Sequence, residues 1–412
     1  MRHKGVHARL REVSAISASS KGINILHVLR APVGGLFRHV VDLARGQAER
    51  GHRVGLIVDA TTGGSHAQAT LEALSPRLAL GITRVPMNRQ LGRDDVAAVA
   101  HVGRRAASVA ADVLHGHGAK GGAYARLAGG AQAIRAYTPH GGSLHYRWDS
   151  PTGLLYLSLE RLLMARTDLF LFESAYGRDT FRSKLGDPGA SAHVVHNGVT
   201  PAEFEPIVTD PSAADLVFVG ELRVLKGVDV LIQAMALLNQ DGRRLSATIV
   251  GDGPDRAAFE AQVRAQGLAD SVRFVGVKPA RAAFACGRLL VVPSRAESLP
   301  YIVLEAAAAG VPLITTNVGG IPEIFGRDAS DLVPPGDPAG LARAIGLALG
   351  DLVHKRAAGA RLRARVRQNF STLAMTDAVL AAYDEALACR QGWSPAISAT
   401  PHVGDPPRLM VR

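Results

Sequence analysis

The sequence predicts an α/β protein with two doubly wound parallel-sheet domains, one after the other along the chain. Short apolar runs typical of buried strands alternate with stretches of helical apolar spacing throughout. This alternation of strands and helices is interrupted once, by the Pro-, Asn- and Asp-rich run HNGVTPAEFEPIVTDPSAAD at 196–215, which is typical of a linker. The 412 residues are enough for two such domains, each with a sizeable core.

The expected elements of the first half begin with a strand at 23–29 and a second at 53–59. Between them, apolar residues three and four apart predict a helix over 34–51 that ends at Gly51. Strands alternating with helices imply parallel sheets covered on both faces. Further strands are expected at 112–118, 169–174, 215–220, 246–253, 272–277, 289–294 and 312–316, and further helices at 227–238, 255–267 and 303–310.

These patterns divide the chain into five segments. We expect a flexible N-terminus at 1–21, a first domain at 22–200, a second domain at 201–370, a C-terminal helix at 371–390, and a disordered tail rich in Pro and Ser at 391–412. The first twenty residues have no apolar core, so no signal peptide is expected. Two cysteines, Cys286 and Cys389, form no disulfide or zinc pattern, which favours a reduced, cytoplasmic setting.

The positive charge of the chain is confined to its first half. Residues 1–200 hold 25 Lys+Arg against 14 Asp+Glu, whereas residues 201–412 hold 22 against 22. One basic half indicates an anionic partner, such as a membrane surface, a phosphorylated substrate or nucleic acid, or else a solvated Arg-rich surface. Because this half lacks interleaved aromatics and any nucleic-acid module, a nucleic-acid partner is not expected.

The segment FVGELRVLKGVDVLIQA predicts an anion site. A strand ends at Gly220, a loop carries Arg223 and Lys226, and a helix begins near Gly227. Two cations beside a helix N-terminus suit a diphosphate, although two solvated loop cations are the simpler alternative. A second glycine motif, IVGDGPDRAAFE, fits a dinucleotide fingerprint poorly, because Arg256 occupies the place of the third glycine.

The segment SRAESLPYIVLEAAAAGVP places two carboxylates, Glu297 and Glu305, eight positions apart in apolar surroundings. Glu297 follows a strand, and Glu305 lies about one and a half turns into the next helix. The backbone N–H groups of Ser298 and Leu299 are expected to point into a cleft at the start of this helix. A buried acid needs a partner, and the deeper one can accept both hydroxyls of a ribose.

Together these segments resemble glycosyltransferase family 4. The resemblance rests on PSRAESLPYIVLEAAAAGVPLITTNVGGIPEI and FVGELRVLKGVDVLIQA, supported by YTPHGG, DVLHGHGAKGG, HNGV and PVGGLFRHV, and it covers roughly residues 22–390. It implies the GT-B fold, in which two Rossmann-like domains face a cleft and a C-terminal helix crosses back to the first domain. It also implies retention of anomeric configuration, no metal ion, and a donor site in the second domain.

The resemblance assigns roles to residues of the second half. Glu305 holds the donor ribose, Glu297 contacts the donor sugar, Lys226 neutralises the diphosphate, and Val277 lies near the base. Many family members carry arginine where this chain has Glu221, so Arg223 is expected to supply that cation. The expected donor-binding set is Arg223, Lys226, Val277, Glu297, Ser298, Leu299 and Glu305, and the expected catalytic set is Glu297, His140 and Lys226.

The resemblance also assigns three features of the first half. His140 lies near the transferred sugar. Gly34 and Gly35 let a loop approach the phosphates through backbone N–H groups, because glycine permits that close approach. His117 follows a strand end on the same acceptor side. No metal site is expected, since the chain has no Asp-x-Asp motif.

The expected function is transfer of a hexose from a UDP- or GDP-linked sugar to a saccharide or lipid-linked acceptor. The family suggests bacterial surface polysaccharide or glycolipid synthesis, in the cytoplasm or on the inner face of the plasma membrane, with no cofactor beyond the donor. Two alternatives remain open: another GT-B enzyme, such as a sugar-nucleotide epimerase, and a non-catalytic nucleotide-sugar-binding protein. Glu221 in the phosphate loop prompts the second.

Overall fold

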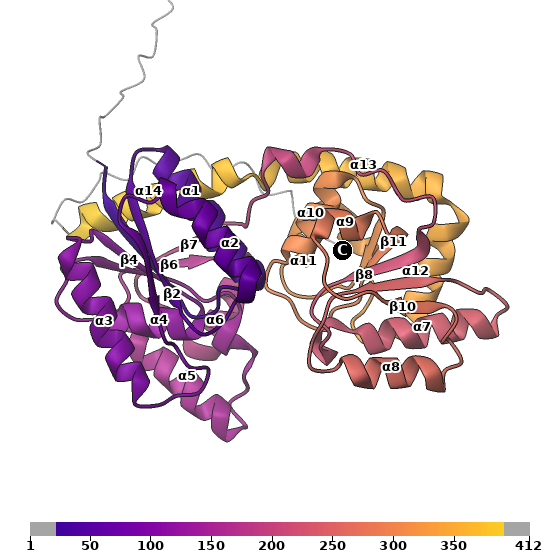
Figure 1. The fold of residues 1–412 in the computed structure, drawn as a ribbon, viewed down its shortest axis with the longest axis horizontal. Coiled ribbons are helices and arrows are strands. Elements are labelled where there is room, and N and C mark those ends of the chain that lie inside the picture. The colour runs from indigo at the N-terminus through magenta and orange to yellow at the C-terminus, as the bar shows by residue number, and fades with distance from the viewer. Residues whose placement is uncertain (1–21, 391–412) are drawn as a thin grey trace, which may run out of the picture.

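The first of two lobes is built on a seven-stranded parallel sheet of order β3-β2-β1-β4-β5-β6-β7 (Figure 1). The computed structural model describes residues 22–390; the segments expected at 1–21 and 391–412 lie outside this range. The strands are β1 (Asn24–Leu29), β2 (Arg53–Asp59), β3 (Gly81–Val85), β4 (Val113–His117), β5 (Ile134–Thr138), β6 (Leu169–Phe172) and β7 (Ser191–Val194). The helices are α1 (Gly34–Glu49), α2 (Gly64–Leu74), α3 (Asp94–Ser108), α4 (Gly118–Leu127), α5 (Pro151–Met164) and α6 (Ala175–Leu185).

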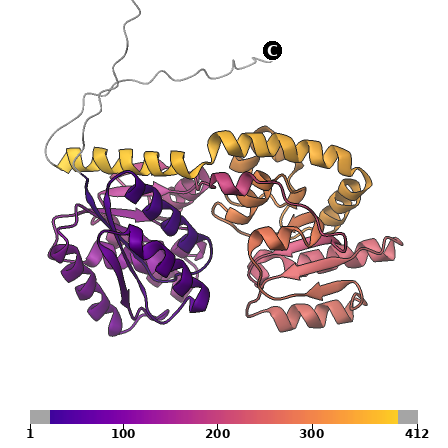
Figure 2. The same ribbon diagram turned by 45° about the horizontal axis from the view of Figure 1, so that its top comes forward.

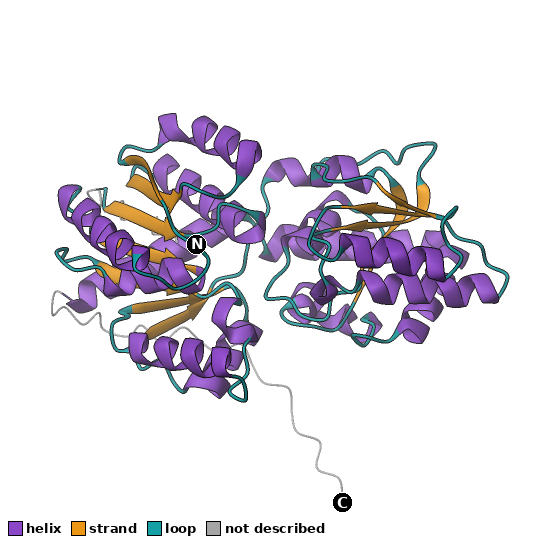
Figure 3. Ribbon diagram, turned by 60° about the horizontal axis from the view of Figure 1, so that its bottom comes forward, coloured by secondary structure: helices purple, strands orange, loops and turns teal. Residues whose placement is uncertain are grey.

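The second lobe is built on a five-stranded parallel sheet of order β10-β9-β8-β11-β12. Its strands are β8 (Ala214–Val219), β9 (Ala247–Val250), β10 (Val272–Phe274), β11 (Gly287–Val292) and β12 (Leu313–Thr315). Its helices are α7 (Val228–Gln240), α8 (Arg256–Ala265), α9 (Ala280–Phe284), α10 (Tyr301–Ala309), α11 (Ile321–Phe325), α12 (Pro338–Gly350) and α13 (Leu352–Asn369). Helices cover both faces of the sheets (Figure 3), so the predicted fold class is confirmed.

The strand orders fix where a ligand is expected. In the first sheet the order reverses between β1 and β4, and in the second between β8 and β11. Open parallel sheets bind ligands at such switch points, outside the carboxyl ends of the strands. The β1–α1 junction, the β4–α4 junction, the loop after β8 and the loop after β11 all start at these points, and they carry most of the residues predicted from the sequence.

The last helix, α14 (Thr372–Arg390), returns to the first lobe, as the resemblance implies. Figure 2 shows α13 and α14 running in succession over the two lobes. Met375, Val379 and Tyr383 are buried in the first core. A Cβ on Gly46 of α1 would lie 2.5 Å from Thr376 Oγ1, so the glycine allows the close approach of α14 to α1.

Local sequence explains where helices begin. Ser150 and Ser174 accept hydrogen bonds from the backbone N–H groups of Gly153 and Gly177, which caps α5 and α6. Within residues 22–390, no helix combines the length and apolar character needed to cross a bilayer.

Candidate active site

The loop after β8 is shaped so that two cations lie beside a helix N-terminus. A short 3₁₀ turn over Val224–Lys226 leads into Gly227, whose φ is +72°. A Cβ there would lie 1.9 Å from the carbonyl oxygen of Pro293, so only glycine fits. Lys226 is thereby held at the start of α7, where unpaired N–H groups and the helix dipole favour an anion.

The second glycine motif supports this phosphate loop, which accounts for its weak likeness to a dinucleotide fingerprint. The carbonyl of Asp252 accepts from the N–H of Leu222 at 2.9 Å, and the carboxylate of Asp255 accepts from the N–H of Val224 at 2.8 Å. A Cβ on Gly253 would lie 2.5 Å from the carbonyl oxygen of Leu222. The GDGPD segment therefore braces the loop that carries Arg223 and Lys226.

Lys226 and Glu297, two of the predicted catalytic residues, contact each other. The ammonium of Lys226 donates to both carboxylate oxygens of Glu297, at 2.7 and 2.9 Å. Ser294 Oγ donates to the same carboxylate at 2.7 Å. By contrast, Arg223 lies 3.7 Å from Glu221, its one ion-pair partner within residues 22–390, and the two side chains are 43% and 53% exposed. Arg223 is thus weakly held and free to turn toward a diphosphate.

Glu305 does not face bulk solvent; its carboxylate forms an ion pair with Arg38 of α1, in the other lobe. Arg38 also pairs with Glu203 and Asp42 and lies 4.8 Å above the Tyr301 ring. The hydroxyl of Tyr301 is buried, with no hydrogen-bond partner among the described residues. A ribose at Glu305 would therefore share the carboxylate with the Arg38 guanidinium.

Val277, Ser298 and Leu299 have different surroundings. Val277 is 78% exposed in the loop after β10. Ser298 Oγ donates to Glu173 of the first lobe at 3.0 Å, and the carbonyl of Leu299 accepts from the Asn197 side chain at 2.9 Å. Within residues 22–390, the N–H groups of Ser298 and Leu299 make no hydrogen bond, so they remain available to a ligand.

The predicted glycines of the first lobe lie beside the start of α10. Gly34 has a φ of +65° and open space around it, and a Cβ on Gly35 would lie 3.3 Å from the ring of Tyr301. These two glycines are the first residues of α1 rather than part of the preceding loop, so the N-terminal end of α1 reaches the start of α10.

His140 lies after β5 with a φ of +52°, an uncommon conformation for a non-glycine residue. Its Nδ1–H donates to Glu173 at 2.7 Å, and its Nε2 lies 3.1 Å from His117 Nδ1. Burial raises the pKa of Glu173, but the charge and hydrogen bond of His140 outweigh it and bring the pKa down to about 2. The carboxylate also accepts from Asn197 at 3.1 Å. Strain at His140 is thus held in place by an anionic partner.

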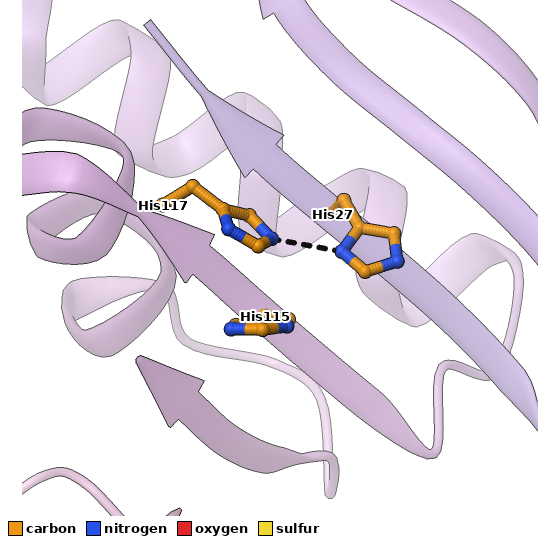
Figure 4. Close-up of side chains that lie close together, drawn as sticks. All are labelled: His27, His115 and His117. Carbon is orange, nitrogen blue, oxygen red and sulfur yellow. Dashed lines mark hydrogen bonds between the residues drawn. The ribbon is translucent and has the colours of Figure 1, made fainter. Parts of the chain in front are cut away.

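Two more histidines, His27 and His115, lie beside His117 in the sheet. His27 Nδ1 and His117 Nε2 lie 2.9 Å apart (Figure 4), and His115 contacts Tyr383 and Thr138 at 2.7 and 2.9 Å. Burial lowers the pKa of His27 to about 4 and keeps His115 and His117 well below their usual range, so these rings are neutral.

Two groups of these histidines have ligand atoms within 4.8 Å of one another, close enough to hold a metal ion: His27, His115 and His117, and His39, His117 and His140. However, both ring nitrogens of His27, His115, His117 and His140 already have side-chain partners. Side-chain hydrogen bonds therefore satisfy these four rings, whereas His39 has a side-chain partner at Nδ1.

A buried ion pair anchors the loop that carries His140. Glu160 of α5 accepts from Tyr137 at 2.8 Å and Ser143 at 2.9 Å, which flank the loop. Arg126 donates to Glu160 at 2.8 Å and is itself fully buried. The two charges are paired, as burial demands, although Arg126 Nη1 has no hydrogen-bond partner among the described residues; the guanidinium lies 3.8 Å from the centre of the Tyr137 ring.

Sequence reasoning missed several residues of this site. Glu173 is the second-last residue of the segment LFLFES, and an acid at the carboxyl end of a buried strand is the signal that could have identified it. His145 follows the YTPHGG motif; burial and the nearby Lys184 lower its pKa, and Lys226 and Arg223 also act on it. Asn197, in the HNGV segment, links His39 at 2.9 Å to Glu173 at 3.1 Å.

Two facing parallel-sheet lobes, with the candidate site at both switch points, define the two-domain GT-B class. The family model for Glycosyltransferase Family 4 matches residues 33–203, and that for Glycosyl transferases group 1 matches residues 213–351. The chain belongs to this glycosyltransferase family.

Individual relatives match more narrowly. The chain is 31% identical over 229 residues to glycogen synthase of Mycobacterium tuberculosis (54% of this chain and 55% of that protein). It is 35% identical over 199 residues to D-inositol 3-phosphate glycosyltransferase of Jonesia denitrificans (42% and 47%). The chain thus spans about half the length of the curated relatives it matches.

Solved structures share the fold over most of the chain. Anabaena HepE in complex with UDP aligns with a TM-score of 0.71 and 18% identity, over 89% of this chain and 100% of that one. Sucrose-phosphate synthase from Thermosynechococcus elongatus aligns with a TM-score of 0.73 and 22% identity, over 90% and 100%.

Proposed function

We propose that this protein transfers a hexose from a nucleoside-diphosphate sugar to a saccharide or lipid-linked acceptor, with retention of configuration and without a metal ion. The observation that carries the proposal is the meeting of both lobes at one site. Ser298, on the same loop as Glu297, donates to Glu173 at 3.0 Å; Glu297 holds Lys226 of the neighbouring loop, and Glu173 holds His140 of the first lobe.

The second lobe provides the features that a diphosphate leaving group needs. As the anomeric C–O bond breaks, negative charge grows on the phosphate, and Lys226 lies where it can neutralise that charge. A single preorganised donor of this kind is typically worth about 3 kcal/mol of barrier. Arg223, weakly held by Glu221, is the second cation. Glu297 orients Lys226 and is placed to contact the sugar.

The first lobe provides a fixed polar wall for the sugar. Because Glu173 accepts from Nδ1–H of His140, the imidazole is locked in one orientation, and its Nε2 edge is the part that can change partners. In a retaining reaction the acceptor enters on the face from which the phosphate departs, and the phosphate itself takes the acceptor proton. His140 then positions and polarises, and Glu173 acts through His140 as a positioning residue.

The UDP of one structural neighbour supports a uridine nucleotide, while GDP remains the other candidate. The names of the curated relatives, glycogen synthase and D-inositol 3-phosphate glycosyltransferase, support a sugar or sugar-like acceptor. A role in bacterial surface polysaccharide or glycolipid synthesis is part of this proposal.

Thermal unfolding with UDP, GDP and ADP, then with their sugars, tests the donor site. A ligand that binds only the folded state stabilises it, by about 2.7 kcal/mol when the ligand is present at one hundred times its Kd. This stabilisation raises the unfolding midpoint. We expect one diphosphate to stabilise the protein, and its sugar to release free hexose slowly without acceptor. No response to any nucleotide contradicts the proposal, stabilisation without release favours the non-catalytic alternative, and an epimerised sugar favours the epimerase.

A further inference from the structure

His39 of α1, in the buried histidine cluster, has one ring nitrogen without a partner. The side chain is 3% exposed. The amide nitrogen of Asn197 donates to Glu173 at 3.1 Å and to the Leu299 carbonyl at 2.9 Å, so its amide oxygen accepts from His39 Nδ1–H at 2.9 Å. Burial lowers the pKa of His39 to about 3, so the ring is neutral and Nε2 carries a lone pair. Within residues 22–390, no side chain donates a hydrogen bond to that nitrogen.

His140 directs a second lone pair into the same cluster. One ring nitrogen from each of His39, His117 and His140 lies within 4.8 Å of the other two. The rings of His39 and His140 meet edge to face, with their centres 4.9 Å apart. Because His140 Nδ1–H donates to Glu173, a neutral His140 has its lone pair at Nε2, the atom 3.1 Å from His117 Nδ1.

The hydrogen bonds behind His117 leave a third lone pair. Gln47 Oε1 lies 2.8 Å from His27 Nε2, and a carbonyl oxygen only accepts, so this nitrogen carries the proton. His27 is neutral, and its Nδ1 therefore accepts from His117 Nε2–H at 2.9 Å (Figure 4). A neutral His117 then has its lone pair at Nδ1, facing that of His140. Facing lone pairs repel unless a cation lies between them.

His39 decides which kind of cation fits. A single proton shared between His117 and His140 leaves Nε2 of His39 without a partner. Turning the Gln47 amide round reverses the hydrogen bonds behind His117 and makes its Nδ1 a donor to His140, but Nε2 of His39 still has none. A metal ion accepts all three lone pairs at once.

We propose that His39, His117 and His140 form a binding site for a divalent transition metal such as Zn²⁺. Neutral imidazole is a good ligand for zinc, copper and nickel, and three histidines with an open fourth position are a known zinc arrangement. Imidazoles that ligate a metal usually donate their other N–H to a fixed acceptor. Here the three acceptors are already in place: Asn197, Glu173 and His27.

The ion would inhibit the enzyme rather than serve as its cofactor. It would occupy Nε2 of His140, the edge to which the proposed function assigns the sugar, so this consequence rests on that function. The site belongs to the first lobe and has nitrogen ligands, whereas Lys226 of the second lobe neutralises the diphosphate. Metal-free transfer and inhibition by a metal are therefore compatible.

Metal binding by the full chain, without an affinity tag, tests the site directly. We expect equilibrium dialysis to give one Zn²⁺ per chain. Co²⁺ in place of Zn²⁺ should show the intense visible absorption of a four-coordinate ion, since coordination geometry sets that spectrum. Neither readout needs a donor or activity. A wild-type chain that binds neither ion overturns the inference.

Variants locate the bound ion. His39→Gln should bind Zn²⁺ at least tenfold more weakly, because removing even an outer-shell partner costs about 10–100-fold in metal affinity. His115→Gln disrupts the other group of close histidines and should bind like wild type. His66→Gln, at an exposed histidine on α2, is the matched control. Thermal unfolding of the metal-free variants establishes that each is folded.

The outcomes separate this inference from the proposed function. Undiminished binding by His39→Gln overturns the site, and a loss confined to His115→Gln assigns the ion to His27, His115 and His117 instead. In the transfer reaction, Zn²⁺ should inhibit and a chelator should restore the rate; zinc binding with undiminished transfer overturns the inhibitory role. Zinc binding that depends on His39, in a protein that responds to no nucleoside diphosphate, contradicts the proposed function and leaves the metal site established.

Discussion

The two sides of the proposed site are built in opposite ways. On the second lobe, the phosphate loop is open, and Arg223 and Glu221 are about half exposed and 3.7 Å apart. On the first lobe, His140 is enclosed by Glu173 and His117, with both ring nitrogens engaged. One side is free to change partners when a charged ligand arrives, and the other is fixed before it arrives. The difference suggests that nucleotide binding is adaptive, whereas sugar positioning is preorganised.

Lys226→Ala should have the largest effect, because it removes the cation from the adaptive side. We expect turnover to fall about 10²–10³-fold, the usual loss for a preorganised charge-stabilising donor. Acceptor KM should change little, since Lys226 contacts the donor end. Steady-state kinetics with varied acceptor measures both. Arg264→Ala, at an exposed cation on α8, is the control. Unchanged donor kinetics would show that the charge is neutralised elsewhere.

Glu173→Gln tests whether the first-lobe side is preorganised. The amide keeps the shape but weakens the hold on His140 Nδ1–H, and we expect kcat to fall roughly tenfold to a hundredfold, as for other groups that orient a histidine. Donor KM should stay close to the wild-type value. In proton NMR, the Nδ1–H signal of His140 should broaden or shift. If stability falls while kcat and this signal are unchanged, Glu173 is purely structural.

The sequence predicted the two sides unequally. The second-lobe residues fall in two short segments, so one loop and one helix pattern were enough to propose Lys226, Glu297 and Glu305 as site residues. The first-lobe network joins His27, Glu173 and residues as distant as Tyr383, which contacts His115 at 2.7 Å. Such contacts depend on strand order and on the return of α14. No local pattern carries that information, so His140 was identified and its partner was not.

The linkage between lobes was also unpredictable for a physical reason. The sequence predicts that Glu305 holds the donor ribose. The structure places Arg38 of the other lobe against its carboxylate. An acid buried in an apolar helix needs a partner. The sequence indicates that need but not which residue meets it, because no periodic pattern in the sequence encodes how the two sheets are placed relative to each other.

Glu305→Ala examines this shared carboxylate. A hydrogen-bonded charge is worth about 1.5–3 kcal/mol, so donor affinity should fall at least tenfold. Turnover at saturating donor should change far less than in Lys226→Ala. Titration with the stabilising nucleoside diphosphate measures the affinity, and Glu260→Ala on α8 is the control. Equal affinity for wild type and variant would mean that Glu305 serves only to pair with Arg38.

Glu323→Gln should have the smallest effect, because it weakens a contact between lobes rather than the site. The carboxylate accepts from the N–H groups of Ala175 and Tyr176 at the start of α6, and from His196, each at 2.9 Å. Burial raises the pKa of Glu323, but these hydrogen bonds outweigh it, so the pKa lies below its usual range. Losing the charge at a helix N-terminus should cost about 1 kcal/mol of unfolding free energy at neutral pH.

The pH dependence of this difference follows from the direction of the shift. A carboxylate whose folded-state pKa is depressed stabilises fully above its unfolded pKa, about 4.3, and loses that contribution as pH falls through the folded-state value. Denaturant unfolding of wild type and Glu323→Gln should therefore converge in acid and differ most near neutrality. His196→Gln separates the titration of that partner, and Glu205→Gln, at an exposed acid, should show no such convergence. A constant difference at every pH would mean that the shape of the side chain, not its charge, joins the two lobes.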